Sequence, residues 1–159
     1  GQTTLEDKLS ETRNAIKNGA DEIDYVVNLT KLKAGDTAYI ESEMARITDI
    51  CREFSVVSKV IFENCYLTED EKKTLCHIAT KVKPDFIKTS TGFGTGGATF
   101  EDVALMKRET EGSGVKIKAA GGIRTLKTAL EMINLGVSRI GSTSSVAIME
   151  EYMANSPLL

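Results

Sequence analysis

Asp85-Phe-Ile-Lys-Thr-Ser-Thr-Gly92 and Val115-Lys-Ile-Lys-Ala-Ala-Gly-Gly122 carry the strongest structural signal in this chain of 159 residues. Each stretch places a lysine, Lys88 or Lys118, inside a short apolar run that is typical of a buried strand, and each ends in glycine. A solvated lysine belongs on a helix face or in a loop, so these two are expected at the carboxyl ends of strands. In α/β proteins, ligands bind and catalytic residues gather there.

Strands and helices alternate along the rest of the chain. Strands are predicted at 22–28, 58–64, 86–90, 115–119 and 137–141, and helices at 3–18, 36–54, 68–81, 99–111, 125–135 and 145–153. This alternation indicates right-handed βαβ units around a parallel sheet. Counting in twos along the strands puts charged residues on one face and aliphatic residues on the other, which suits a barrel lumen. The predicted fold class is α/β, of the TIM (β/α)8-barrel family. Five of the eight strands that closure requires are present.

The composition favours one globular domain over residues 1–159, with 41% hydrophobic and 27% charged residues and no compositional break. A net charge of −3 without a basic run argues for a small-molecule partner rather than nucleic acid. No apolar run reaches the ~18 residues of a membrane span, and the first ten residues do not resemble a signal peptide. Three cysteines without a C-x-x-C pair suit reduced thiols, so a cytoplasmic location is expected. With His77 as the single histidine, neither a metal nor a cofactor is expected.

Lys88 and Lys118 suggest imine chemistry. Burial lowers the pKa of a lysine, a second cation nearby lowers it further, and the neutral amine that results is a nucleophile near neutral pH. The alternative is that each lysine reaches out of its strand to pair with a carboxylate. The presence of both, at the ends of neighbouring strands, favours the chemical interpretation.

Asp24 is the carboxylate expected beside these lysines. It is flanked by apolar residues, so it would be desolvated unless paired, and a buried carboxylate there can relay protons. A structural ion pair is an equal alternative at this point. On the second strand, Lys59 and Glu63 are expected to form a charge ladder inside the barrel.

Glycine-rich turns follow the third, fourth and fifth predicted strands, at 91–97, 120–125 and 141–145. Backbone amides in such turns, with hydroxyls and a helix N-terminus, can bind a phosphate. Turns require glycine for other reasons as well, but three at consecutive strand ends favour a phosphate site. Whether Arg124 adds charge there or only forms a local cap stays open.

Residues 86–99, 115–125, 20–28 and 139–145 resemble the deoxyribose-phosphate aldolases, class I aldolases built on a TIM barrel. The first two motifs are long and specific. The resemblance implies that Lys88 is the Schiff-base lysine, that Lys118 depresses its pKa, and that Asp24 is a proton-relay acid. It also implies reversible cleavage of 2-deoxyribose 5-phosphate into acetaldehyde and glyceraldehyde 3-phosphate.

The same resemblance implies substrate-binding residues in the three glycine-rich turns: Thr91, Gly92, Gly121, Gly122, Gly141, Thr143 and Ser144. Thr143 stands where the family typically has serine, which keeps the hydroxyl. Family members carry three further strands before the point that corresponds to Gly1. Without them, two sheet edges and an apolar lumen would be exposed. Either the missing piece exists elsewhere, or two remnants associate, or the chain is a stable fragment; a homo-oligomer is expected.

Two other interpretations remain. The chain could be a non-catalytic remnant that keeps the phosphate cradle and serves as a binding or oligomerising module. It could also be a different imine-forming aldolase, although the positions of Asp24 and Lys118 favour the deoxyribose-phosphate type.

Overall fold

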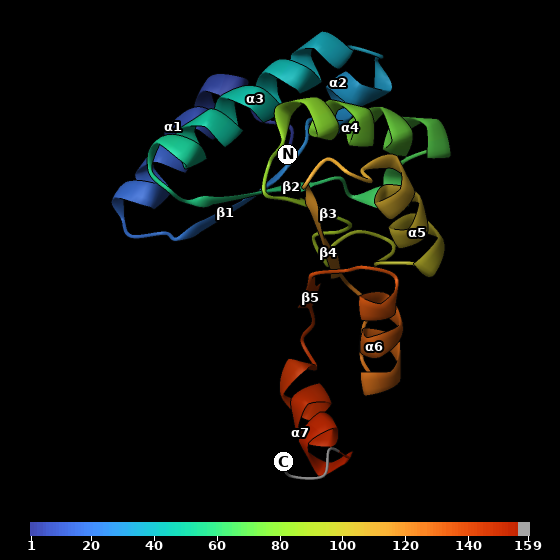
Figure 1. Ribbon diagram of the computed structural model, residues 1–159. Helices are drawn as coiled ribbons and strands as arrows, with labels where there is room; N and C mark the ends of the chain where they lie inside the picture. The colour runs from blue at the N-terminus through green and yellow to red at the C-terminus, as the bar shows by residue number, and fades with distance from the viewer. Residues whose placement is uncertain (156–159) are drawn as a thin grey trace.

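A computed structural model describes residues 1–155 and consists of one parallel sheet with helices on its outer side (Figure 1). The five strands follow one another in the order β1-β2-β3-β4-β5. Their bounds are Glu22–Val26, Val57–Ile61, Phe86–Lys88, Lys116–Ala120 and Arg139–Gly141. The helices α1 to α7 span Leu5–Lys17, Leu29–Lys33, Thr37–Glu53, Glu69–Val82, Phe100–Glu109, Leu126–Asn134 and Ser145–Asn155, and a 3-10 turn η1 covers Asn64–Tyr66. The prediction of five parallel βα units is confirmed.

The sheet is strongly curved, as expected of part of a barrel. Arg139 in β5 pairs with Glu22 in β1, although three strands separate β1 from β5 in the sheet. Lys118 in β4 likewise reaches Asp24 in β1. Such contacts require a sheet that curls around a concave face, because strands lie about 4.8 Å apart in a flat one. The partial barrel of the prediction is therefore present, and charged side chains line its concave face.

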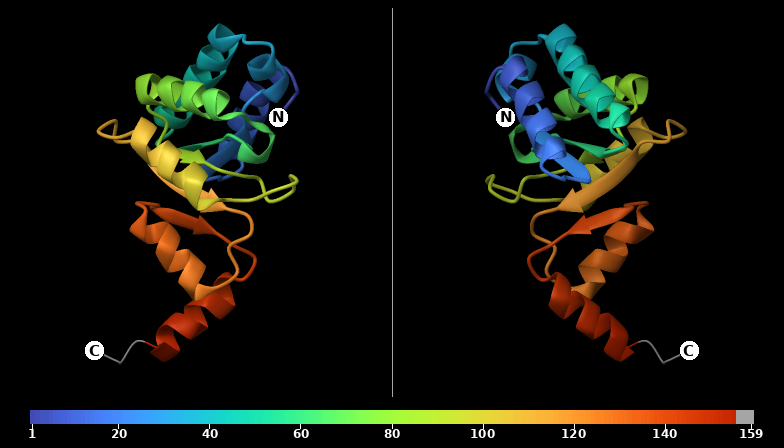
Figure 2. Two further views of the ribbon diagram at one scale, coloured as in Figure 1. Left: turned by 90° about the vertical axis from the view of Figure 1, so that its right-hand side faces the viewer. Right: turned by 90° about the vertical axis from the view of Figure 1, so that its left-hand side faces the viewer.

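The hydrophobic core lies between the convex face of the sheet and the helices. Val60 in β2, Ile87 in β3 and Ile117 in β4 are at most 2% exposed and face the helices. Ile40 and Met44 of α3 are equally buried against this face. Alternation along each strand thus sends aliphatic residues to the helices and charges to the concave side. Figure 2 shows the helices of the first four units stacked along the sheet, with α6 and α7 continuing beyond β5.

Polar caps set where the helices begin. Five N-cap side chains accept a hydrogen bond from a backbone N–H in the first turn of α1, α3, α4, α5 and α6: Thr4, Asp36, Thr68, Thr99 and Thr125. The predicted capping box of α4 is confirmed, since the Thr68 and Glu71 side chains each bond the other's backbone N–H. For α4, α5 and α6, the cap fixes where the helix begins after the loop that follows a strand.

Two short elements were missed, and the first three strands end earlier than predicted. Asn28 does not extend β1 but caps α2, accepting from the N–H of Lys31 at 3.1 Å. Glu63 does not extend β2; it adopts a left-handed conformation with φ 57° and leads into η1. A residue with positive φ breaks the alternation of a strand, so Glu63 does not share the face of Lys59.

The cysteines should differ sharply in reactivity. Burial raises the pKa of Cys51 to about 11 and that of Cys76 to about 12, whereas Cys65 is partly exposed. Because the thiolate is the reactive form, we expect one thiol per folded chain to react rapidly with a disulfide reagent, and all three in denaturant. Peptide mass spectrometry should place the rapid adduct on Cys65. Equal labelling of Cys76 and Cys65 in the folded chain would contradict the packing of α4.

Candidate active site

The carboxylate of Asp24 lies at the centre of a cluster of three lysines from three different strands. Its Oδ1 accepts from Lys59 Nζ at 2.8 Å. Its Oδ2 accepts from Lys88 Nζ at 2.7 Å and from Lys118 Nζ at 3.1 Å. The strand register explains the convergence, because Asp24 stands opposite Lys59 in the β1–β2 pair, and Lys88 opposite Lys118 in the β3–β4 pair.

The lysines are more deeply buried than the carboxylate they surround. The side chains of Lys59, Lys88 and Lys118 are 2%, 11% and 16% exposed, whereas that of Asp24 is 28% exposed. The expectation of a buried Asp24 is therefore wrong in degree: it lies on the open side of β1, at the edge of the sheet. The desolvated partners are the amines, which is the condition that imine formation requires.

The pKa values respond to this arrangement in opposite ways. Partial burial raises the pKa of Asp24, but hydrogen bonds from Lys59, Lys88 and Lys118 outweigh it and hold that pKa well below its usual range. Desolvation lowers the pKa of Lys118, against the hydrogen bond from its ammonium to Asp24, and the charges of Lys88 and Lys59 lower it further. Asp24 is thus a firmly ionised carboxylate, and Lys118 is an amine that loses its proton more readily than a free lysine.

Glu22 extends the cluster toward the amino ends of the strands. Lys59 Nζ lies 2.6 Å from Glu22 Oε2, and the same carboxylate pairs with Arg139. The predicted ladder between Lys59 and Glu63 is therefore wrong. Glu63 instead accepts hydrogen bonds from the N–H and hydroxyl of Thr91. The left-handed backbone at Glu63 sends its side chain toward the loop after β3 rather than along the concave face of β2.

A cavity of about 300 Å³ opens beside Lys88 and Lys118 at the carboxyl ends of β3, β4 and β5. Three cationic side chains line it, Lys88, Lys118 and Arg124, and none of its described lining residues is acidic. The lining comprises Lys88, Thr91, Gly92, Lys118, Ala120, Gly121, Gly122, Ile123, Arg124, Gly141, Ser142 and Thr143. All three predicted glycine-rich turns therefore contribute to one cavity with a positive lining.

Most of the predicted site residues lie together in this cavity, and two stand apart. Asp24 does not line the cavity, but it pairs with Lys88 and Lys118, which do. Ser144 is not part of the lining; its N–H donates to Ser142 Oγ at 2.9 Å. Ser142, which does line the cavity, was not singled out from the sequence.

Glycines at positions 97, 121 and 122 allow two of the turns to approach one another closely. Gly121 and Gly122 have consecutive positive φ angles of 83° and 79°, which residues with a side chain rarely adopt. A Cβ on Gly97 would lie 2.3 Å from the carbonyl oxygen of Gly121, so the two loops touch backbone to backbone. Gly121 and Gly122 also line the cavity, where backbone amides can bind an anion.

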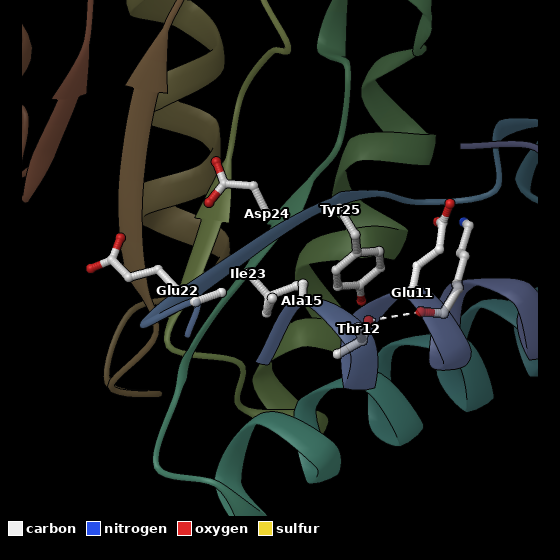
Figure 3. Close-up of a pocket in the computed structure, with 9 residues that line it drawn as sticks. Glu11, Thr12, Ala15, Glu22, Ile23, Asp24 and Tyr25 are labelled. Carbon is white, nitrogen blue, oxygen red and sulfur yellow. Dashed lines mark hydrogen bonds between the residues drawn. The ribbon is translucent and has the colours of Figure 1, made fainter. Parts of the chain in front are cut away.

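A second cavity, of about 270 Å³, lies between α1 and β1 (Figure 3). In Figure 3 the ring of Tyr25 points toward Thr12 of α1, whereas Asp24 points to the other side of the strand. Strand alternation therefore separates this cavity from the lysine amines, apart from the shared edge at Asp24. The lysine-lined cavity is the stronger candidate for chemistry, because it combines convergent amines with glycine-rich turns.

Within residues 1–155, no group of three His, Cys, Asp or Glu side chains is arranged to hold a metal ion. The His77 side chain is 62% exposed and lies 3.2 Å from Glu109, and His77 is not among the residues that line the cavity. None of the described helices is long and apolar enough to cross a membrane.

The curved sheet and the lysine-lined cavity place the chain among (β/α)-barrel proteins with functional residues at the carboxyl ends of their strands. The model of the DeoC/LacD family aldolases matches residues 1–143, and the chain belongs to this family. A deoxyribose-phosphate aldolase of Lactobacillus acidophilus is 57% identical over 150 residues, and one of Bacteroides thetaiotaomicron is 51% identical over 152 residues. These alignments cover 94% and 96% of the chain, but 63% of each relative's length.

Solved structures give the same result. An aldolase designated QR15 superposes with a TM-score of 0.90 at 40% identity, covering 97% of this chain and 68% of that one. A deoxyribose phosphate aldolase from Aeropyrum pernix, described as a unique tetrameric structure, superposes with a TM-score of 0.87 at 28% identity. That alignment covers 98% of this chain and 65% of the other. The fold is thus that of the aldolase barrels.

Replacing Asp24 by asparagine should destabilise the chain by about 2 kcal/mol at neutral pH, because three ammonium groups would lose their shared counterion. The folded-state pKa of Asp24 is depressed, so its contribution is fully present above about pH 4 and is lost as the pH falls toward the folded-state value. Urea denaturation at several pH values would measure the difference.

The matched control is Asp49→Asn, at a carboxylate that is 70% exposed. The control should change the free energy of unfolding by no more than about 0.5 kcal/mol. Added salt should reduce the loss caused by Asp24→Asn, since salt screens the repulsion among the lysines. An equally small effect of both substitutions would contradict the central role of Asp24.

Proposed function

We propose that this chain carries the catalytic centre of a deoxyribose-phosphate aldolase. The reaction is the reversible cleavage of 2-deoxyribose 5-phosphate to acetaldehyde and glyceraldehyde 3-phosphate. The observation that supports it best is the pairing of Lys88 and Lys118 on one oxygen of Asp24, beside a cavity walled by glycine turns. One end of the cavity offers amines for a carbonyl carbon, and the other offers a positive lining for a phosphate.

Lys88 is the proposed Schiff-base residue. Its neutral amine attacks the C1 aldehyde carbon of the open-chain sugar, and loss of water from the carbinolamine gives an iminium ion. Removal of the proton from the C3 hydroxyl then breaks the C2–C3 bond, which releases glyceraldehyde 3-phosphate and leaves an enamine on Lys88. Protonation of the enamine at C2 and hydrolysis of the new iminium ion release acetaldehyde and restore the amine.

Lys118 and Asp24 are the proposed proton carriers. Both lysine nitrogens contact the same Asp24 oxygen, so a proton can pass from Lys88 to Lys118 without either group moving far. Desolvation lowers the pKa of Lys118, so its ammonium gives up a proton more readily than that of a free lysine, as a proton carrier requires. Conversion of Lys88 to a neutral amine removes one of the charges that depress the pKa of Asp24, so Asp24 becomes a better base at the step that needs one.

The phosphate is proposed to bind at the turns after β4 and β5. Gly121, Gly122, Gly141 and Thr143 line that end of the cavity, with Ser144 directly after them at the start of α7. Arg124 also lines the cavity. This position favours a role in adding positive charge to the phosphate site rather than a role as a local cap. Thr91 and Gly92 line the cavity near Lys88, where the sugar chain would run. Phosphate sites in barrels of this type commonly use the corresponding loops.

Borohydride trapping tests this function directly. With 2-deoxyribose 5-phosphate present, reduction should attach the sugar-derived group to Lys88, and peptide mass spectrometry should locate it. Lys88→Ala should abolish both adduct and turnover while the circular dichroism spectrum stays native. Lys118→Leu should lower turnover by about 100-fold, because it removes the group that takes the proton from Lys88.

Lys127→Ala is the matched control for these variants, since that side chain is 85% exposed on α6. It should leave trapping and turnover unchanged. A folded chain that gives no adduct would favour the alternative of a non-catalytic, phosphate-binding module. An adduct on Lys118 in place of Lys88 would reverse the two lysine roles.

We also propose that the chain acts as a homo-oligomer in the cytoplasm. An apolar groove between α6 and α7 includes Leu130, Ile133, Met149 and Tyr152, each at least 41% exposed, and such a surface favours association. The three free cysteines suit a reducing compartment. Light scattering during size-exclusion chromatography should give a mass above that of one chain, and Met149→Asp should lower it. A monomer at all concentrations would contradict the proposal.

A further inference from the structure

Glu63 combines burial, an unusual backbone conformation and a direct contact with the cavity wall. It is 5% exposed, and its φ of 57° and ψ of 59° lie in the left-handed region that residues with a side chain seldom occupy. The chain keeps this conformation because its neighbours hold it: Asn64 N–H donates to the carbonyl of Thr89 at 2.9 Å. Strained residues held in this way cluster at functional sites.

Both carboxylate oxygens of Glu63 are used by one residue of the loop after β3. Oε1 accepts from the N–H of Thr91 at 3.1 Å, and Oε2 accepts from the Thr91 hydroxyl. The Thr91 hydroxyl in turn accepts from the N–H of Phe93 at 3.0 Å. Thr91 lines the lysine cavity, whereas Glu63 does not, so Glu63 can act on a ligand only through Thr91.

The rest of the loop is packed against the same residue and its neighbour. A Cβ on Gly94 would lie 2.8 Å from Cys65 Sγ and 3.2 Å from Glu63 Oε1. On the opposite side of the loop, Gly97 touches the backbone of Gly121. The segment 91–97 is thus held between the end of β2 and the turn after β4, and Figure 2 shows this yellow-green loop extending past the strands.

These hydrogen bonds also fix the polarity of the Thr91 hydroxyl. A hydroxyl has one proton to donate and two lone pairs. Its proton is given to Glu63, and one lone pair accepts from Phe93, so a single lone pair is left for a ligand. Thr91 can therefore accept a hydrogen bond from a sugar hydroxyl but cannot donate one to a carbonyl.

We propose that Glu63 is a positioning residue of the candidate active site. It holds Thr91 and the loop 91–97 in place and makes the Thr91 hydroxyl a pure acceptor, which selects a substrate carrying a hydroxyl at that point. The consequence for turnover rests on the proposed aldolase function. The consequence for the loop does not, and a measurement without substrate can test it.

Glu63→Gln is the decisive variant, because glutamine keeps the shape of the side chain. Its NH₂ group would donate to the Thr91 hydroxyl and so reverse the hydrogen bond. We expect the KM for 2-deoxyribose 5-phosphate to rise at least tenfold with kcat reduced less, and the thermal midpoint to stay near that of the wild type. In a Thr91→Val background the same substitution should change kcat/KM less than twofold, since the hydroxyl is already absent.

Glu53→Gln, at a glutamate that is 62% exposed on α3, should leave kcat/KM unchanged. Multiplicative effects of Glu63→Gln and Thr91→Val would overturn the proposal, as would a Glu63→Gln variant with wild-type KM.

Limited chymotrypsin digestion tests the loop without any substrate. Phe93 is 97% exposed within the loop, and Phe54 is 49% exposed at the end of α3, where it serves as an internal reference. Cleavage after Phe93 relative to Phe54 should be at least threefold faster in Glu63→Gln than in the wild type or Glu53→Gln. An unchanged ratio would overturn the proposal. If the wild type shows neither turnover nor adduct, the proposed function fails, and this ratio alone decides whether Glu63 holds the loop.

Discussion

The ion cluster around Asp24 is the interaction on which the concave face depends. Three ammonium groups from β2, β3 and β4 meet there, and one carboxylate from β1 neutralises part of their repulsion. Each of these side chains occupies the inner position of its strand, so the cluster can form only if the sheet curves enough for β4 to face β1. The curvature of the sheet, the ion pairs of Asp24 and the positions of the lysine amines therefore depend on one another.

The same cluster creates a conflict between stability and chemistry. Hydrogen bonds to Asp24 favour the charged form of the lysines, but an aldehyde reacts only with a neutral amine. Different lysines of the cluster meet these two requirements. Lys59 is almost completely buried and pairs with both Glu22 and Asp24, which suits a structural role in holding β1 to β2. Lys118 has a lowered pKa and shares its Asp24 oxygen with Lys88, which suits a group that exchanges a proton.

Much of this cluster could be predicted from the sequence, because side chains alternate between the two faces of a strand and the pattern shows which residues share a face. Apolar flanks and terminal glycines located Lys88 and Lys118, and alternation put Asp24 on their face. The partner of Lys59 was missed, although parallel register places Asp24 opposite it. Glu63 was beyond reach for a different reason: left-handed backbone at a residue other than glycine follows from tertiary contacts and leaves no local pattern. The five-residue helix α2 was missed because it is too short to show periodicity.

Glu63 also shows why strands alone cannot complete such a site. Strands place amines accurately, but the substrate lies above them among loops, and a displacement of about 1 Å can cost a large part of the rate. A loop with four glycines between positions 91 and 99 has few side chains to anchor it. Its order must come from outside, and it does: one carboxylate takes both hydrogen-bond donors of Thr91, and the backbone of Gly121 supports the far end. A glycine-rich loop is thus compatible with a precise site, because a buried carboxylate and a neighbouring backbone hold it at both ends.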